Sequence, residues 1–211
     1  MKILCLADTH GFHVELPEDW FPLADVLVCA GDVSVGGTEL EIANFLCWFN
    51  GLAYEHKIFI AGNHDFLFQT KPEQARRLIP DDIIYLEDSF CIIDGAKVYG
   101  SPWTLTFLDW AFMLDRGGPM RATWERIPKD TDILITHGPP YGIRDFSKYQ
   151  NGHAGCEELL KVVQAMPLKC YVFGHVHESY GAYSNGETFF ANAFIVNEIY
   201  KVTNKPVLVE I

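Results

Sequence analysis

Basic residues are scarce in this sequence. Its 211 residues include 16 lysines and arginines against 28 aspartates and glutamates, which gives a formal net charge of −12. Proteins that bind long nucleic acids or anionic membranes carry basic patches, so both classes of partner are disfavoured. A small substrate that carries a phosphate is not excluded, because two bound divalent cations would add four positive charges at one point.

Paired cysteines and long apolar runs are also absent. None of the six cysteines belongs to a CxxC pair, and three of them (Cys5, Cys29 and Cys170) lie in apolar runs, where a reduced thiol behaves as a small hydrophobe. No apolar run approaches 18 residues, and no signal-peptide pattern opens the chain. We therefore expect a soluble protein of the reducing cytoplasm without a zinc ribbon, a redox motif or a membrane span.

Short apolar runs alternate with helical patterns early in the chain, and hairpin signals follow. Asp94-Gly95 and Asn185-Gly186 predict hairpins, and a capping box at residues 38–41 predicts a helix up to Phe49. Strands are expected at residues 2–6, 26–30, 57–61, 132–136, 169–173 and 207–211, and further helices at 72–79 and 156–166. Crossovers require parallel strands and hairpins antiparallel ones, so we expect an α/β fold with two mixed β-sheets flanked by helices. One domain is expected to span residues 1–211.

Polar side chains follow five of the expected strands at the point where each strand ends. Gly62-Asn63-His64-Asp65 follows the third apolar run in this way. The full set comprises Asp8, His10, Asp32, Asn63, His64, His137, His175 and His177. Each motif alone is ordinary turn chemistry. Ligands bind at the carboxyl ends of strands in open α/β sheets, so five such motifs in order predict one shared site.

The donor types in this set predict bound metal ions. Carboxylate and amide oxygens mixed with imidazoles suit Mn, Fe or Zn better than Ca or Mg, and the lack of cysteine ligands argues against a structural zinc site. Val176 would place the rings of His175 and His177 on opposite sides of an extended chain. We therefore expect the chain to bend there.

Taken together, the motifs resemble those of the calcineurin-like metallophosphoesterases. The resemblance is carried by Asp8-Thr9-His10, Gly31-Asp32, Gly62-Asn63-His64-Asp65, His137-Gly138 and Gly174-His175-Val176-His177. Further stretches, including Gly100-Ser101-Pro102-Trp103, resemble the compact MPPED-type branch, which is similar to class III cyclic-nucleotide phosphodiesterases. The resemblance implies two β-sheets packed face to face in a four-layer α/β/β/α sandwich.

The resemblance also implies two divalent metal ions, with Mn, Fe or Zn expected. Asp8, His10 and His177 would hold one ion, and Asn63, His137 and His175 would hold the other. Asp32 would bridge them. A hydroxide that bridges the ions would attack the phosphate in line.

His64 has a separate role in this scheme. It would be the catalytic general acid and would contact the substrate beside Asn63, whereas Asp65 would steady its ring. Proton donation to the leaving oxygen is typically worth about 10²–10⁴-fold in rate.

Residues outside the motifs are weaker candidates for binding the substrate. His13 lies three positions after His10, and Arg144 follows His137, although Arg144 and Asp145 also fit a structural ion pair. Three aromatic residues are candidates for stacking on a nucleobase or for simple packing: Tyr141, Trp103 and Phe107.

The resulting hypothesis is a dinuclear metal-dependent phosphodiesterase that hydrolyses small phosphodiesters, with cyclic nucleotides as plausible substrates. The alternatives are a phosphomonoesterase or nuclease of the same fold and, less favoured, a non-catalytic metal-binding scaffold. Neither long nucleic acid nor a membrane is expected as a partner. The sequence does not determine the oligomeric state.

Overall fold

The first β-sheet is formed mainly by the amino-terminal part of the chain. The computed structural model describes residues 1–211. The strand order of this sheet is β15-β1-β2-β3-β4, and its strands are β1 (Lys2–Leu6), β2 (Val26–Ala30), β3 (His56–Ile60), β4 (Ile83–Tyr85) and β15 (Val207–Glu210). β1 to β4 are parallel, and β15 pairs with β1 in the antiparallel direction. The sheet is therefore mixed.

The second sheet has the strand order β13-β14-β12-β9-β6-β5. Its strands are β5 (Ser89–Ile93), β6 (Ala96–Ser101), β9 (Ile133–Thr136), β12 (Cys170–Phe173), β13 (Gly181–Ser184) and β14 (Phe189–Asn192). β5 and β6 form the hairpin predicted at Asp94-Gly95, where both residues have positive φ. β13 and β14 form the hairpin predicted at Asn185-Gly186. The four central strands are parallel, so this sheet is mixed as well.

Five α-helices accompany the sheets, and none of them is long and apolar enough to cross a membrane. They are α1 (Glu39–Gly51), α2 (Phe66–Thr70), α3 (Pro72–Arg76), α4 (Gly118–Trp124) and α5 (Glu157–Gln164). The predicted capping box is present at α1, where Thr38 and Glu41 satisfy each other's backbone amides. α3 ends three residues before the predicted Ile79, because the chain continues in tighter turns from Arg77.

Short elements complete the chain. Two single turns of 3₁₀-helix, η1 (Phe12–Glu15) and η2 (Glu18–Trp20), follow β1. Two short strands, β7 (Thr104–Leu105) and β8 (Met113–Leu114), lie between β6 and α4. A small hairpin of β10 (Phe146–Ser147) and β11 (Gly152–His153) lies between β9 and α5.

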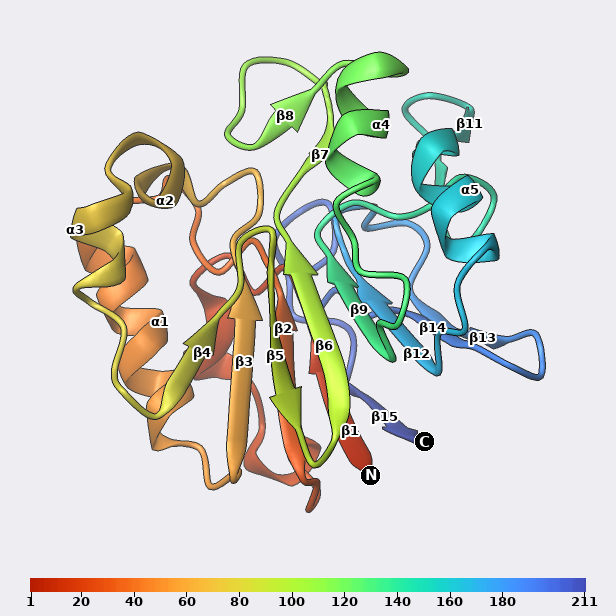
Figure 1. Cartoon of the computed structure of the whole chain (residues 1–211). Coiled ribbons are helices and arrows are strands. Elements are labelled where there is room, and N and C mark those ends of the chain that lie inside the picture. Colours follow the sequence, from red (N-terminus) through yellow and green to blue (C-terminus); the bar gives the residue numbers. More distant parts are fainter.

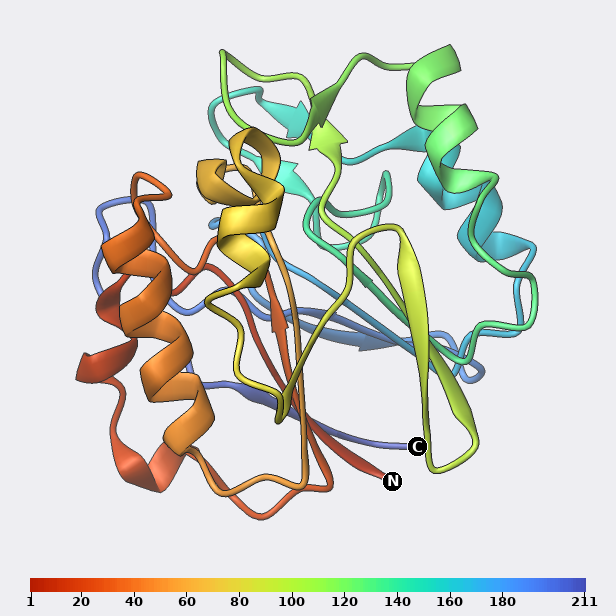
Figure 2. The ribbon, with the colours of Figure 1, turned by 60° about the vertical axis from the view of Figure 1, so that its left-hand side comes forward.

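The molecule has four layers, as the sequence predicts. Figure 2 shows α1, α2 and α3 outside the first sheet, and α4 and α5 outside the second. The core between the sheets contains Ile3, Val28, Ile58, Val98 and Ile135, all of them buried. A second apolar cluster packs the outer face of the first sheet against its helices, and a third does the same for the second sheet. Each fully buried aliphatic side chain contributes about 1.5–3 kcal/mol, so all three clusters hold the layers together.

The direction of the parallel strands positions the site. β1, β2 and β3 of the first sheet and β9 and β12 of the second all end at the same side of the molecule, whereas both chain termini lie at the opposite side (Figure 1). The polar segments that follow these strands are therefore neighbours in space, although His175 after β12 lies 167 residues from Asp8 after β1 in the sequence.

Gly100 gives a test of the contact between the sheets. A Cβ at this position in β6 would lie 2.7 Å from Cγ2 of Ile60 in β3 and would also overlap Leu86. We expect Gly100→Ala to lower the free energy of unfolding by about 1–3 kcal/mol, because the two packed sheets cannot separate locally. Denaturant unfolding measures this change. Gly51→Ala is the control, since nothing lies within 4 Å of its Cβ and it should change stability by no more than about 1 kcal/mol. Equal stability of the two variants would contradict the tight approach.

Candidate functional site

Four of the predicted metal ligands adopt the left-handed backbone conformation. Their φ angles are 53° for Asp8, 42° for His10, 52° for Asp32 and 69° for His175. This conformation is costly for residues other than glycine and recurs at functional sites. At His175 it supplies the expected bend, and both His175 and His177 line the same pocket.

Two glycines of the motifs are required by close approach. A Cβ at Gly62 would overlap the Asp32 carboxylate, and a Cβ at Gly174 would overlap the carboxylate of Asp8. Any side chain at either position would displace a buried acid. This contact explains why glycine precedes Asn63 and His175 in the motifs.

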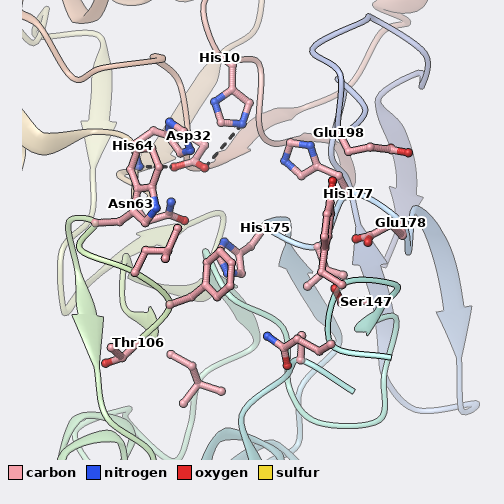
Figure 3. Close-up of a pocket in the computed structure, with 18 of the residues that line it drawn as sticks. His10, Asp32, Asn63, His64, Thr106, Ser147, His175, His177, Glu178 and Glu198 are labelled. Atoms are coloured by element: carbon pink, nitrogen blue, oxygen red, sulfur yellow. Dashed lines mark hydrogen bonds and ion pairs between the residues drawn. The ribbon is translucent and has the colours of Figure 1, made fainter. Parts of the chain in front are cut away.

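Imidazole rings surround the two buried carboxylates. The Asp8 carboxylate lies 3.2 Å from Nε2 of His177, and that of Asp32 lies 3.3 Å from Nε2 of His137 and 3.7 Å from Nε2 of His10. Asp8 is fully buried and Asp32 is almost so. In Figure 3, His10, Asp32 and His177 point toward a common space.

The second nitrogen of two of these rings contacts a backbone carbonyl. Nδ1 of His10 lies 3.2 Å from the Ser34 carbonyl, and Nδ1 of His137 lies 3.0 Å from the carbonyl of Ala30. A carbonyl only accepts hydrogen bonds, so Nδ1 carries the proton and Nε2 of the neutral ring presents a lone pair. Each Nε2 therefore faces a carboxylate oxygen, and a cation is needed between these two acceptors. Histidines that bind a metal ion through one ring nitrogen usually donate a hydrogen bond from the other, as these rings do, so the residues fit divalent ions.

The pKa values of His137 and His10 also reflect the negative charge of the neighbouring carboxylates. Burial alone would lower the pKa of His137, but the charges of Asp32 and Asp8 outweigh it and raise the pKa to about 9. Burial lowers the pKa of His10 to about 4 against the opposing charge of Asp32. The protein can thus hold one extra proton between Asp32 and His137, where a metal ion would serve the same purpose.

The predicted ligands include three groups of three residues, and within each group the possible ligand atoms all lie within 4.8 Å of one another. These groups are Asp8, His10 and His177; Asp8, Asp32 and His137; and His10, Asp32 and His64. The first is the trio predicted for one metal ion. The second contains Asp32, the predicted bridge, together with His137. The geometry therefore brings the predicted ligands together, and the assignment of each to a particular ion stays a prediction.

Asn63 and His175 complete the predicted set. Oδ1 of Asn63 lies 2.8 Å from Nε2 of His137. The ring of His175 lies 5.0 Å from that of His137 between centroids, and the His175 backbone amide donates to the Asp8 carboxylate. Burial, followed by the charge of His137, lowers the pKa of His175 to about 3, so this ring is a neutral donor.

His64 lies beside this group with one nitrogen already bonded. Its Nδ1 donates to the Val35 carbonyl at 2.7 Å, which leaves Nε2 as the available nitrogen. Its backbone amide donates to Asp32 at 2.8 Å. Its ring contacts that of Trp110, with 4.2 Å between centroids. The His64 ring is therefore held from two sides next to the carboxylates.

The role predicted for Asp65 is wrong. Its fully buried carboxylate does not hold the His64 ring but accepts bonds from the amides of Val33, Ser34 and Gly62 and from the Ser34 hydroxyl. Burial and the nearby charge of Asp32 raise the pKa of Asp65 to about 6. Asp65 thus joins the loops after β2 and β3, and the ring-orienting role belongs to the Val35 carbonyl.

The predictions for His13 and Arg144 are also wrong. His13 lies buried against Phe45 and Trp48, with ring centroids 5.6 and 5.1 Å away, and does not line the pocket. Arg144 donates to the Ala182 carbonyl at 2.7 Å, and its guanidinium covers Gly181 outside the pocket. Asp145 pairs with His153 and not with Arg144.

A pocket of about 440 Å³ opens above the carboxylates. Phe107 lines it as the sequence suggests, whereas Trp103 and Tyr141 do not. Trp110, Tyr149 and Tyr200 also line it, and none of the three is predicted from the sequence. They lie in irregular segments without periodicity, so no local signal marks them.

The buried position of His13 gives a prediction for stability against pH. Burial lowers its pKa from 6.5 to about 4, so the unfolded chain binds this proton more readily than the folded protein. Stability should therefore fall as the pH drops from about 6.5 toward 4, by on the order of 2 kcal/mol from this residue. We expect the free energy of unfolding of His13→Phe to fall less than that of the unmodified protein between pH 7 and pH 4. Denaturant unfolding at pH 7, 5.5 and 4 measures the difference. Parallel pH profiles of the two proteins would contradict it, because all other titrating groups are shared.

Comparison with known proteins identifies the family. A family profile described as calcineurin-like phosphoesterase matches residues 1–179. Metallophosphoesterase domain-containing protein 1 of Homo sapiens and its Mus musculus counterpart are each 35% identical to the chain, over all of its length and 71% of theirs. The crystal structure of TT1561 of Thermus thermophilus shares the fold, with a TM-score of 0.59 at 14% identity over 90% of this chain and 88% of that one. The chain therefore belongs to the calcineurin-like phosphoesterase family.

Proposed function

We propose that this chain, a metal-dependent phosphoester hydrolase by its family and its donor set, acts on small phosphodiesters, with cyclic nucleotides within that class. The observation that carries the proposal is the free Nε2 of His64, held beside the carboxylate–imidazole cluster at the base of the pocket. A pocket of about 440 Å³ suits a small substrate.

The residues fit two divalent ions. Asp8, His10 and His177 would hold one, and Asn63, His137 and His175 the other. Asp32 would be shared, since its Oδ2 lies 3.7 Å from Nε2 of His10 in the first group and 3.3 Å from Nε2 of His137 in the second. When bound, two such ions neutralise charge on a phosphate and lower the pKa of an attacking water.

His64 is suited to donate a proton to the leaving oxygen. Its Nδ1 is bonded to the Val35 carbonyl, so only Nε2 can carry a proton toward the substrate. Trp110 packs on the ring and restricts its rotation. The protein thus holds the donor atom in one orientation before the substrate binds, which is the requirement for general acid catalysis.

The charges around the pocket favour a diester over a monoester. Arg116 is the only lysine or arginine that lines the pocket, and its guanidinium is paired with Glu157. A monoester dianion carries about one more negative charge than a diester at neutral pH. Few basic groups are available to bind that additional charge, so the diester is the better-matched substrate.

Aromatic side chains support a nucleotide as one of the substrates. Phe107 and Trp110 line the side of the pocket formed by residues 105–110, and Phe107 is half exposed there. A nucleobase stacks on such rings regardless of its identity. The proposed class of substrates therefore includes cyclic nucleotides.

Two substitutions separate the predicted ligands from the predicted acid. We expect Asp32→Ala to lose both metal ions, because it is the shared ligand. We expect His64→Ala to retain them and to lower kcat by about 10²–10⁴-fold. Metal analysis of the Mn²⁺-loaded proteins and turnover of bis(p-nitrophenyl) phosphate measure the two effects. His56→Ala is the control, since His56 lies at the opposite end of β3. Loss of metal from His64→Ala, or unchanged turnover, would contradict the division of roles.

A pair of chromogenic esters tests the preference for diesters. We expect kcat/KM for bis(p-nitrophenyl) phosphate to exceed that for p-nitrophenyl phosphate by about tenfold or more, because the pocket lacks free basic groups for the second charge. The comparison uses one preparation of Mn²⁺-loaded protein. A higher value for the monoester would identify a phosphomonoesterase and overturn the proposal.

A further inference from the structure

Two acidic side chains line the pocket beyond the predicted metal ligands. Glu178 directly follows His177, and Glu198 lies in the turn after β14. Figure 3 shows both on the side of His177 that is turned away from Asp32 and His64. A substrate that extends past His177 would therefore meet two negative charges.

Backbone contacts hold these two residues at the pocket. Glu178 accepts a hydrogen bond from the Lys148 amide at 3.0 Å, which joins it to the loop of the β10–β11 hairpin. Asn197 closes the turn that carries Glu198, because its side chain accepts from the amides of Ile199 and Lys201 at 3.1 and 3.0 Å. These hydrogen bonds hold in place the two segments that carry Glu178 and Glu198.

The remaining wall offers no compensating positive charge. Leu105, Phe107 and Leu108 form an apolar side together with Trp110. Arg116 is paired with Glu157 and also donates to the Gly155 carbonyl at 3.1 Å. Outside the predicted metal ligands, the pocket thus has an apolar side, an acidic side and uncharged polar residues such as Ser147 and Gln150. Its single lysine or arginine, Arg116, is already paired.

We propose that this pocket selects phosphodiesters that carry no second phosphate. The inference rests on the proposed diesterase function and narrows its substrates to molecules whose remainder is uncharged and partly apolar. An additional phosphate brings a charge of about −1.5 to −2 at neutral pH. It would lie against Glu178 and Glu198, which repel it, or against uncharged side chains, which provide no countercharge for it. Both effects weaken binding of a substrate that carries the second phosphate.

A matched pair of substrates isolates this effect. The p-nitrophenyl ester of thymidine 5′-phosphate is compared with the same ester that carries a 3′-phosphate. Both release p-nitrophenol from the same phosphodiester, so they differ only in the remote charge. We expect kcat/KM of the Mn²⁺-loaded protein for the first to exceed that for the second by about tenfold or more at low salt.

Salt dependence and charge variants distinguish repulsion from steric exclusion. The ratio should fall toward one between 0.01 and 1 M KCl, because the screening length drops from about 30 to about 3 Å. Glu178→Gln and Glu198→Gln should each lower it about threefold at low salt, since each removes one charge and keeps the shape. Glu157→Gln should lower it as well by freeing Arg116. Glu210→Gln is the control, because Glu210 lies in β15 at the other end of β1.

Each outcome decides the inference. A ratio near one at low salt overturns it and leaves the diesterase function intact. A large ratio that neither salt nor the glutamate variants reduce overturns it in favour of steric exclusion. Absence of turnover of both esters, with bis(p-nitrophenyl) phosphate also untouched, overturns the proposed function together with the inference. A ratio that responds to salt and to the glutamate variants, but not to Glu210→Gln, supports it.

Discussion

The buried carboxylates of Asp8 and Asp32 face imidazole Nε2 atoms across 3.2 to 3.7 Å, and this arrangement imposes a requirement on the surrounding structure. Nδ1 of His10 and of His137 contacts a backbone carbonyl, so lone pairs are directed at negative oxygens. Such a cluster is stable only with a cation in it. The raised pKa of His137 shows that a proton meets part of this demand in the protein alone. Divalent ions would meet it fully.

The fold brings these groups together through the direction of its strands. The parallel strands β1, β2, β3, β9 and β12 end at one side, and the four-layer packing places the ends of both sheets next to each other. Asp8, Asp32 and His175 have positive φ angles. This backbone conformation turns their side chains into the shared space. Close packing of the two sheets thus determines how near the ligands from each sheet approach.

The loops after β2 and β3 divide their functions among neighbouring residues. Asp65 binds backbone amides of both loops and is absent from the pocket, whereas His64 enters the pocket with its Nδ1 on the Val35 carbonyl. The base of the pocket and its outer walls differ in charge. The base attracts cations, and the outer walls are apolar or acidic. The proposed substrate, with one phosphate and an otherwise uncharged body, matches both regions.

The sequence by itself determined the two mixed sheets, the hairpins and the list of strand-end donors, because these depend on local periodicity, turn residues and motif order. It also identified the family resemblance. Only the tertiary structure decided which neighbours each side chain meets. It placed Val35 and not Asp65 on the His64 ring, buried His13 under Trp48, turned Arg144 toward β13 and brought Trp110 onto His64. These contacts join segments far apart in the chain, and the loop conformations that create them follow from packing, which leaves no periodic signal in the sequence.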